Sequence, residues 1–169
     1  MKRLTILLLA VPVLVLACGG QESAPEDTAG GAAVGVTVEY TTPEPLPVPE
    51  PKTPKSETDW EARVHNKEIE IIQVLNIINP IAAYISAAFE QYGDQIENPT
   101  VHEEWKDTQA QLQQALALYE DCKKRKAAGR FNKKLFLDLE NTWQLLVKTG
   151  VAGVRTKQMV DAELQKLKS

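Results

Sequence analysis

Residues 101–122 read VHEEWKDTQAQLQQALALYEDC, and this stretch decides the fold class. Intervals of four and three residues alternate within it along one row of mainly apolar side chains. The row consists of Val101, Trp105, Thr108, Leu112, Ala115, Tyr119 and Cys122. Six successive intervals of this kind are typical of a seam in a helical bundle or coiled coil. Asn98-Pro99 supplies an N-cap and a first-turn proline before the row, and Gly129 supplies a stop after it, so the sequence predicts a helix between these signals.

A second helical pattern lies before this stretch. Thr58 and Glu61 have the spacing of a capping box, which predicts a helix start. Apolar residues then recur at helical intervals as far as Gly93. Pro80 falls inside the pattern and is expected to kink or break the helix, because proline lacks an N–H and clashes with the preceding turn. Residues 69–89 are apolar enough to suggest a membrane span, but polar side chains occupy about half of the helix circumference. A deeply buried helix of a soluble bundle is therefore expected instead.

A third helical pattern follows the first stretch. Asn132 is the predicted N-cap, and Phe131 and Phe136 stand at the two positions of a hydrophobic staple around it. An apolar face then continues towards the C-terminus. The segment from Gly150 to Gly153 either breaks this pattern into two helices or permits close helix packing.

Together these patterns predict an all-α fold. At 1.5 Å per residue the three spans are about 50, 46 and 55 Å long, and short connections join them. We expect an antiparallel three-helix bundle over residues 59–169, with four helices if the chain breaks at Pro80 or between Gly150 and Gly153. A domain of about 110 residues can bury its own core. A self-associating coiled coil is the main alternative.

Residues 18–58 differ from the rest in composition. The first part is rich in Gly, Ala, Ser and acidic residues, and the stretch from Pro43 to Pro51 has proline at every second position. Such a segment is too polar and too rich in proline to bury a core. We therefore expect a disordered stalk over residues 18–58, whose proline-rich part acts as a semi-rigid extended spacer.

Residues 1–17 predict an export signal. Lys2 and Arg3 precede an apolar run from Leu4 to Leu16. That run suits a signal peptide but is too short for a bilayer span, which takes about 20 residues. The run ends in Val15-Leu16-Ala17-Cys18. An ordinary secretory signal with an incidental cysteine is one interpretation of this ending.

The tetrapeptide Val15-Leu16-Ala17-Cys18 resembles the lipobox of bacterial lipoproteins, although Val15 stands where leucine is commoner. The resemblance implies that residues 1–17 are removed and that Cys18 becomes the lipid-modified N-terminus of an exported envelope protein. Gly19 is not the aspartate that retains many such proteins at the inner membrane, so the outer membrane is favoured if the source has two membranes. A diacylglyceryl group anchors a protein stably because two or more acyl chains insert together.

Few residues of the expected bundle suit catalysis. His65 and His102 fall at opposite ends of an antiparallel bundle, so they cannot share a metal ion or a haem. Cys122 falls at about the height of His65, near Glu61 and Glu68, where a metal site or a reactive thiol is one interpretation. Its position in the apolar row favours a buried hydrophobic role instead. We therefore expect no catalytic residue, no cofactor and no metal.

The strongest functional signal is a cluster of seven basic residues around the expected turn between the second and third helices. The cluster consists of Lys123, Lys124, Arg125, Lys126, Arg130, Lys133 and Lys134, and no acidic residue lies between Cys122 and Leu137. One interpretation is a solvated turn whose cations favour the carboxyl end of a helix. The other is a surface that binds anions. The stalk would hold this end of the bundle towards the membrane, where anionic lipid headgroups attract basic side chains.

The overall charge of the predicted domain bears on its function. Residues 59–169 carry sixteen acidic and fifteen basic side chains, so the domain lacks the positive footprint of a nucleic-acid binder. We expect a membrane-anchored, non-enzymatic interaction or scaffolding module of the cell envelope. Its partner would be an envelope protein, with anionic lipid or polymer as an accessory ligand. A carrier of a small molecule or lipid, with a cavity between the helices near Pro80, is the alternative.

Overall fold

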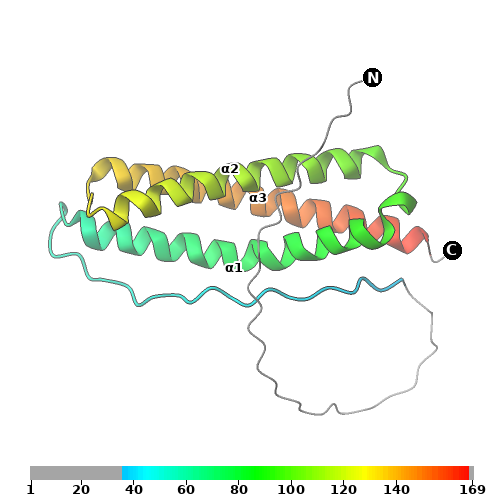
Figure 1. Cartoon of the computed structure of the whole chain (residues 1–169), viewed down its shortest axis with the longest axis horizontal. Coiled ribbons are helices and arrows are strands. Elements are labelled where there is room, and N and C mark those ends of the chain that lie inside the picture. The colour runs from blue at the N-terminus through cyan, green and yellow to red at the C-terminus, as the bar shows by residue number, and fades with distance from the viewer. Residues whose placement is uncertain (1–35, 168–169) are drawn as a thin grey trace, which may run out of the picture. The chain divides into compact units, whose positions relative to one another are not determined.

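The computed structural model describes residues 36–167, and the predicted signal peptide, Cys18 and the first part of the predicted stalk lie outside this range. Three long helices make up most of it: α1 (Trp60–Tyr92), α2 (Pro99–Ala127) and α3 (Lys133–Lys166), with a short 3-10 helix, η1 (Gly93–Gln95), after α1. The helices lie side by side and alternate in direction (Figure 1). The predicted all-α antiparallel three-helix bundle is therefore confirmed.

The start of α1 differs by one residue from the predicted capping box. Asp59 is the N-cap, and its carboxylate accepts a hydrogen bond of 3.2 Å from the backbone N–H of Ala62. Thr58 lies just outside the helix, and its hydroxyl contacts Ser56 instead. Aspartate and threonine are both good caps, so the spacing alone could not choose between neighbours.

The other helix ends follow the sequence signals. Asn98 caps α2 by accepting from the N–H of Thr100 at 3.1 Å, and Asn132 caps α3 by accepting from the N–H of Leu135 at 2.9 Å. Gly129 has a φ of 69°, the left-handed conformation that ends α2 at little steric cost for glycine.

Both α1 and α3 continue through their expected breaks. α1 runs unbroken past Pro80, and α3 runs unbroken past Gly150 and Gly153, so the four-helix alternative is wrong. Packing explains the result at Pro80, because buried side chains such as Ile78 and Ile85 anchor α1 on both sides of the proline. Burial of two such side chains stabilises by more than the one backbone hydrogen bond that proline removes.

The α2 row predicted from the sequence faces the core. Every member is buried except Leu112, which is partly buried. The matching row on α3 contains polar residues: Thr142, Thr149 and Thr156 recur at seven-residue intervals and are fully buried. Each hydroxyl donates to the carbonyl oxygen four residues earlier, at 2.8, 2.8 and 3.0 Å respectively. These local bonds satisfy the hydroxyls, so threonine serves here as a small core residue.

Small residues bring α3 close to α1. A methyl group added at Gly150 would lie 3.2 Å from Cγ1 of Ile78, and one added at Gly153 would lie 3.5 Å from Cγ2 of Ile81. Close packing, the second interpretation of these glycines, is therefore confirmed. The void that remains beside them is about 10 Å³, which is about the space of one water molecule.

A buried ammonium group also links α1 to α3. Lys67 Nζ lies 2.8 Å from Glu140 on α3 and 2.6 Å from Glu70 on α1, and 4.9 Å from the centroid of the Trp143 ring. Burial by itself lowers the pKa of Lys67, but the two carboxylates outweigh it and hold that pKa above its ordinary value. Lys67 is therefore charged at neutral pH and joins the two helices.

α1 has a long apolar stretch but is only partly covered. By length and composition, one helix of the described part, Trp60–Gln95, could cross a membrane, with a mean hydropathy of 1.6 in its most apolar window. Only 28% of that window is buried, so the expectation of a deeply buried helix holds for one face. In the bundle this face packs against α3.

We predict that Gly153→Ala stabilises the fold by about 0.5–1 kcal/mol, because glycine inside a helix costs that much relative to alanine. The new methyl group would make ordinary contacts, 3.5 Å from Ile81 and 4.0 Å from Thr108. Urea unfolding followed by circular dichroism measures the change. Gly150→Ala is the comparison, and it should gain less because its methyl group crowds Ile78. Destabilisation by Gly153→Ala would contradict the packing described here.

Candidate functional site

Residues 36–58, which we call the strap, run along α1 in the opposite direction (Figure 1). The strap is extended as far as Pro54 and turns at residues 55–58 into α1. Side-chain amides of α1 hold its main chain. Asn76 accepts from the N–H of Leu46 at 2.7 Å and donates to the carbonyl oxygen of the same residue at 2.9 Å. Asn66 makes the same pair of bonds with Lys52, both at 2.8 Å. Each amide therefore binds both backbone groups of one strap residue.

A third amide completes the set near the other end of α1. Gln91 accepts from the N–H of Glu39 at 3.0 Å and donates to its carbonyl oxygen at 2.5 Å. Hereafter these three residue pairs are the amide clamps. None of the clamped strap residues is proline, because proline has no N–H to donate. Leu46 lies between two of the alternating prolines and keeps the N–H that Asn76 binds, whereas Glu39 and Lys52 lie on either side of the alternating stretch.

The spacing of the amide clamps matches the geometry of the two chains. The clamped strap positions, 39 and 52, are thirteen residues apart, and the α1 positions, 66 and 91, are twenty-five apart. At about 3.1 Å per residue for a polyproline II segment and 1.5 Å for an α-helix, the two paths are roughly 40 and 38 Å long. An extended proline-rich segment therefore keeps in register with α1 over its whole length.

Further contacts fix both ends of the strap. At its N-terminal end, Val36 and Val38 pack against the core cluster around Ile85, and the rings of Tyr40 and Tyr84 meet edge to face with centroids 5.3 Å apart. These residues give the strap its apolar contribution to binding.

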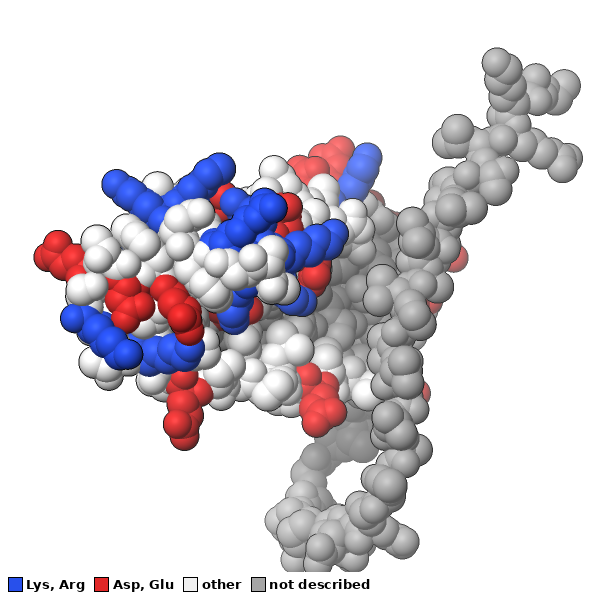
Figure 2. Space-filling view, turned by 60° about the vertical axis from the view of Figure 1, so that its left-hand side comes forward, with Lys and Arg blue, Asp and Glu red and all other residues white. Residues whose placement is uncertain are grey.

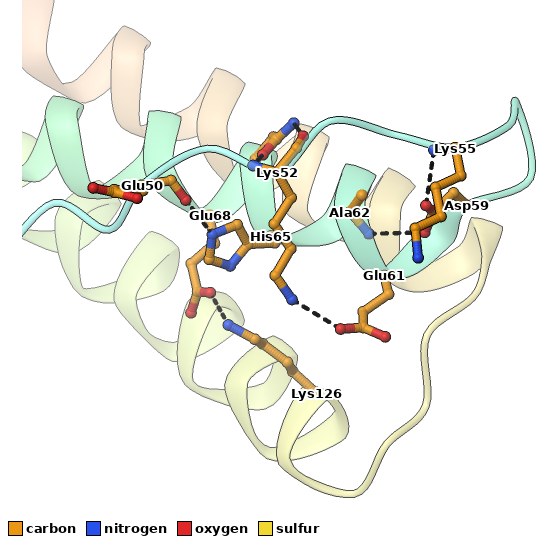
Figure 3. A network of polar contacts seen from close by, with 10 residues as sticks. Glu50, Lys52, Lys55, Asp59, Glu61, Ala62, His65, Glu68 and Lys126 are labelled. Carbon is orange, nitrogen blue, oxygen red and sulfur yellow. Dashed lines mark hydrogen bonds and ion pairs between the residues drawn. The ribbon is translucent and has the colours of Figure 1, made fainter.

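The C-terminal end of the strap is polar. His65 Nε2 lies 2.8 Å from the carbonyl oxygen of Glu50, and Lys52 Nζ lies 2.8 Å from the carboxylate of Glu61 (Figure 3). The N–H of Lys55 donates to the Asp59 carboxylate at 3.0 Å, and this bond helps to lower the pKa of Asp59.

The expected disordered stalk therefore does not describe residues 36–58. The proline-rich composition predicted that this segment cannot form a hydrophobic core by itself, and the strap forms no separate core. The amide clamps supply what composition could not show, namely partners for the strap backbone. Asn66, Asn76 and Gln91 were not distinguishable in the sequence from the other polar residues of α1, which include the amides Gln73 and Asn79.

The strap also changes where the chain leaves the bundle. The OH of Tyr92, the last residue of α1, donates to the carbonyl oxygen of Thr37 at 3.0 Å. Val36 therefore lies at the α1–α2 end, whereas the α2–α3 turn lies at the opposite end (Figure 1). The expectation that the tether holds the basic turn towards the membrane assumed that the chain leaves the bundle at the start of α1, and the strap contradicts that assumption.

The structure brings the seven predicted basic residues to one end of the bundle but pairs four of them with carboxylates. Figure 2 shows Lys and Arg side chains at this end interleaved with Asp and Glu. The pairs are Lys123–Glu120 at 2.7 Å, Arg125–Asp121 at 3.0 Å, Arg125–Asp138 at 2.7 Å, Lys134–Asp138 at 3.3 Å, and Lys126–Glu68. The sequence gap without acids was misleading, since these acids come from flanking turns and from α1.

Lys124, Arg130 and Lys133 remain without an ion pair to any residue in the range 36–167, and all three are exposed. These three residues are the part of the cluster that is free to bind an external anion. Asp138, in contrast, pairs with two cations of the cluster, Arg125 and Lys134. Its burial raises its pKa, but hydrogen bonds from Arg125 and Lys134 outweigh burial and hold the pKa of Asp138 below its usual value.

Cys122 is a core residue at this end. It is 2% exposed, and its Sγ accepts from Nη2 of Arg125 at 3.3 Å. Burial raises the pKa of the Cys122 thiol, although the Arg125 bond acts against it. A buried thiol with a raised pKa is a poor nucleophile.

The histidines and Glu68 do not join Cys122 in a site. His65 binds the strap, and His102 Nε2 lies 2.7 Å from the carbonyl oxygen of Ile96. Glu68 accepts from Tyr119 at 3.3 Å and pairs with Lys126 (Figure 3). Within residues 36–167 no group of three or more His, Cys, Asp or Glu side chains could hold a metal ion.

We predict that Asn76→Ala frees the middle of the strap. The Leu46 amide would lose its acceptor, so its hydrogen exchange should accelerate roughly three- to tenfold, as expected for loss of one intramolecular hydrogen bond. Amide exchange followed by NMR measures this. Gln73→Ala is the matched control, because Gln73 is exposed one turn earlier on α1 and makes no hydrogen bond with the described residues. Unchanged exchange at Leu46 in Asn76→Ala would show that the clamp does not hold the strap.

No family model, curated protein or solved structure matches this chain.

Proposed function

We propose that the protein is an exported bacterial lipoprotein, anchored through lipid on Cys18, whose bundle is a non-enzymatic interaction module of the cell envelope. The observation that carries this proposal is the strap. A tether bound along α1 gives the bundle a defined exit point, which suits a protein that must present one surface to a partner. The lipobox resemblance of residues 15–18 supplies the anchor.

The exit point favours one orientation. Seventeen residues separate Cys18 from Val36, and they can span at most about 60 Å. The bundle extends about 50 Å beyond Val36 along α1 before reaching the α2–α3 turn. When the linker is extended, Lys124, Arg130 and Lys133 lie at the end of the bundle that is farther from the anchoring membrane. The proposed partner is therefore an acidic surface of an envelope protein or an anionic polymer, rather than the headgroups of the anchoring membrane.

The side chains that could support chemistry have structural roles, which favours binding over catalysis. Cys122 is buried with a raised thiol pKa, and His65 holds the strap. The carrier alternative required a cavity near Pro80 and the α3 glycines. The void of about 10 Å³ there is far below the roughly 300 Å³ of a small-molecule site, so nothing favours a carrier.

A first prediction concerns orientation. In full-length protein reconstituted into vesicles, with Cys122→Ser, a donor dye on Glu97→Cys should transfer energy to a membrane acceptor far better than a dye on Arg130→Cys. The two sites are exposed and lie at opposite ends of the bundle. Alanine at all three amide-clamp side chains should reduce the difference. Cys18→Ala, checked by intact mass, should leave the protein off the vesicles. Equal transfer from both sites would contradict the proposed orientation.

A second prediction concerns partner capture. Lys124→Glu with Arg130→Glu should weaken capture of envelope partners by roughly tenfold, because two exposed cations of the proposed binding surface become anions. Lys106→Glu with Lys148→Glu is the control, since it makes the same charge change at exposed positions elsewhere. Quantitative affinity capture from envelope extracts compares the two variants with the unmodified protein. An equal loss in both variants would show a general charge effect, and turnover of an envelope substrate would overturn the non-enzymatic assignment.

A further inference from the structure

An open groove of about 870 Å³ lies at the basic end, between the end of the strap and the first turns of α3. Trp60 and Phe136 line it, with ring centroids 6.1 Å apart, and Leu137 lines it with 46% of its surface exposed. The groove thus combines exposed apolar side chains with charged groups, a combination that suits a recognition site.

The groove also contains a guanidinium group that is held in place. The Arg63 guanidinium carbon lies 4.9 Å from the Trp60 ring centroid and 4.8 Å from that of Phe136. Its Nη1 donates to the carbonyl oxygen of Glu57 at 2.9 Å. Among the described residues no carboxylate pairs with Arg63. Two aromatic contacts and one hydrogen bond thus orient a cation whose remaining N–H groups are available, and a fixed guanidinium suits a carboxylate.

The charges that line the groove favour an anion. Lys133, one of the three unpaired basic residues, is a second cation in the lining, and Glu57 is the one carboxylate there. The described groove therefore has two cations, an aromatic floor and one acidic residue on its rim. A ligand that complements it must combine negative charge with apolar surface.

We propose that this groove binds a peptide segment of a partner protein in which a carboxylate lies next to a large apolar side chain. Arg63 and Lys133 receive the carboxylate, and Trp60, Phe136 and Leu137 receive the apolar side chain. The inference deepens the proposed function, because it names the chemistry by which the basic end recognises its partner.

The test uses the full-length protein and a short probe peptide, acetyl-Gly-Glu-Leu-Phe-amide. NMR shifts should appear at the indole of Trp60 and at Lys133. Replacing the probe glutamate by glutamine should weaken binding about tenfold, as expected for loss of a charge-assisted pair. Lys133→Gln should weaken it about threefold, as expected for one exposed ion pair. Lys134→Gln, whose side chain instead pairs with Asp138, should leave it unchanged. Glu57→Gln should strengthen binding, because it removes the competing anion.

Equal binding of the glutamate and glutamine probes would overturn the proposal, as would shifts located away from the groove. Tighter binding of dodecyl phosphate than of the peptide would also overturn it, because a lipid would then be the better occupant. Peptide binding to the purified protein depends neither on lipidation nor on the envelope partner whose capture is tested with the Lys124→Glu and Arg130→Glu variant. If the protein fails to bind the peptide but still captures envelope partners, the groove proposal alone is rejected. If it binds the peptide but captures no envelope partner, the proposed interaction module is rejected.

Discussion

Backbone hydrogen bonding along the strap is the constraint on which the arrangement of the molecule depends. An extended segment rich in proline cannot pair with itself, so its N–H and C=O groups must bind water or another element. The amide clamps satisfy one residue at a time, at positions that a polyproline rise brings opposite Asn66, Asn76 and Gln91 on α1. The exit of the chain at Val36 follows from this pairing. So does the groove, since residues 54–58 at the end of the strap form one of its walls.

The bundle beneath the strap depends on a different device, the small residues of α3. Glycine and threonine let the helix axes approach where leucine would hold them apart. Gly150 reaches Ile78 closely, and the hydroxyl of Thr156 lies 3.4 Å from that of Thr108 on α2. α3 therefore packs tightly against both neighbours. The same closeness leaves almost no free volume inside, which is why the molecular surface, rather than the interior, carries the functional proposals.

Much of the fold was predictable because local signals and apolar periodicity agreed. The α2 row, the caps Asn98 and Asn132 and the stop at Gly129 all follow from short stretches of sequence. The seam of α3 was harder to predict, because buried threonines look polar until their hydroxyls are seen to bond within the helix. Pro80 misled for the opposite reason: a local rule for breaking helices was overridden by packing on both sides.

The candidate site was less predictable, since it depends on contacts between residues distant in sequence. The seven basic residues were identified, but Glu68 and Asp138, which neutralise some of them, lie on other turns. The sequence predicted a spacer over residues 36–58 because their composition indicates that they cannot bury a core. Composition does not indicate whether side chains of a helix can bind the backbone of such a segment. Arg63 was not singled out, although Arg63 and Trp60 at helical spacing were a weak signal for a stacked cation.

The direction of the strap also has a mechanical consequence. A partner held at the α2–α3 end and a lipid held in the membrane would pull on the molecule from opposite ends, parallel to α1. The load would then run along the strap, so that the three clamps resist it together in shear instead of opening one after another as in peeling. The covalent path from the start of α1 to Val36 already lies along this load, because the strap is extended between the same two ends of the bundle, so release of the clamps would add little length. The strap would therefore act as a stiff link between membrane and partner, and the bundle would stay folded beside it.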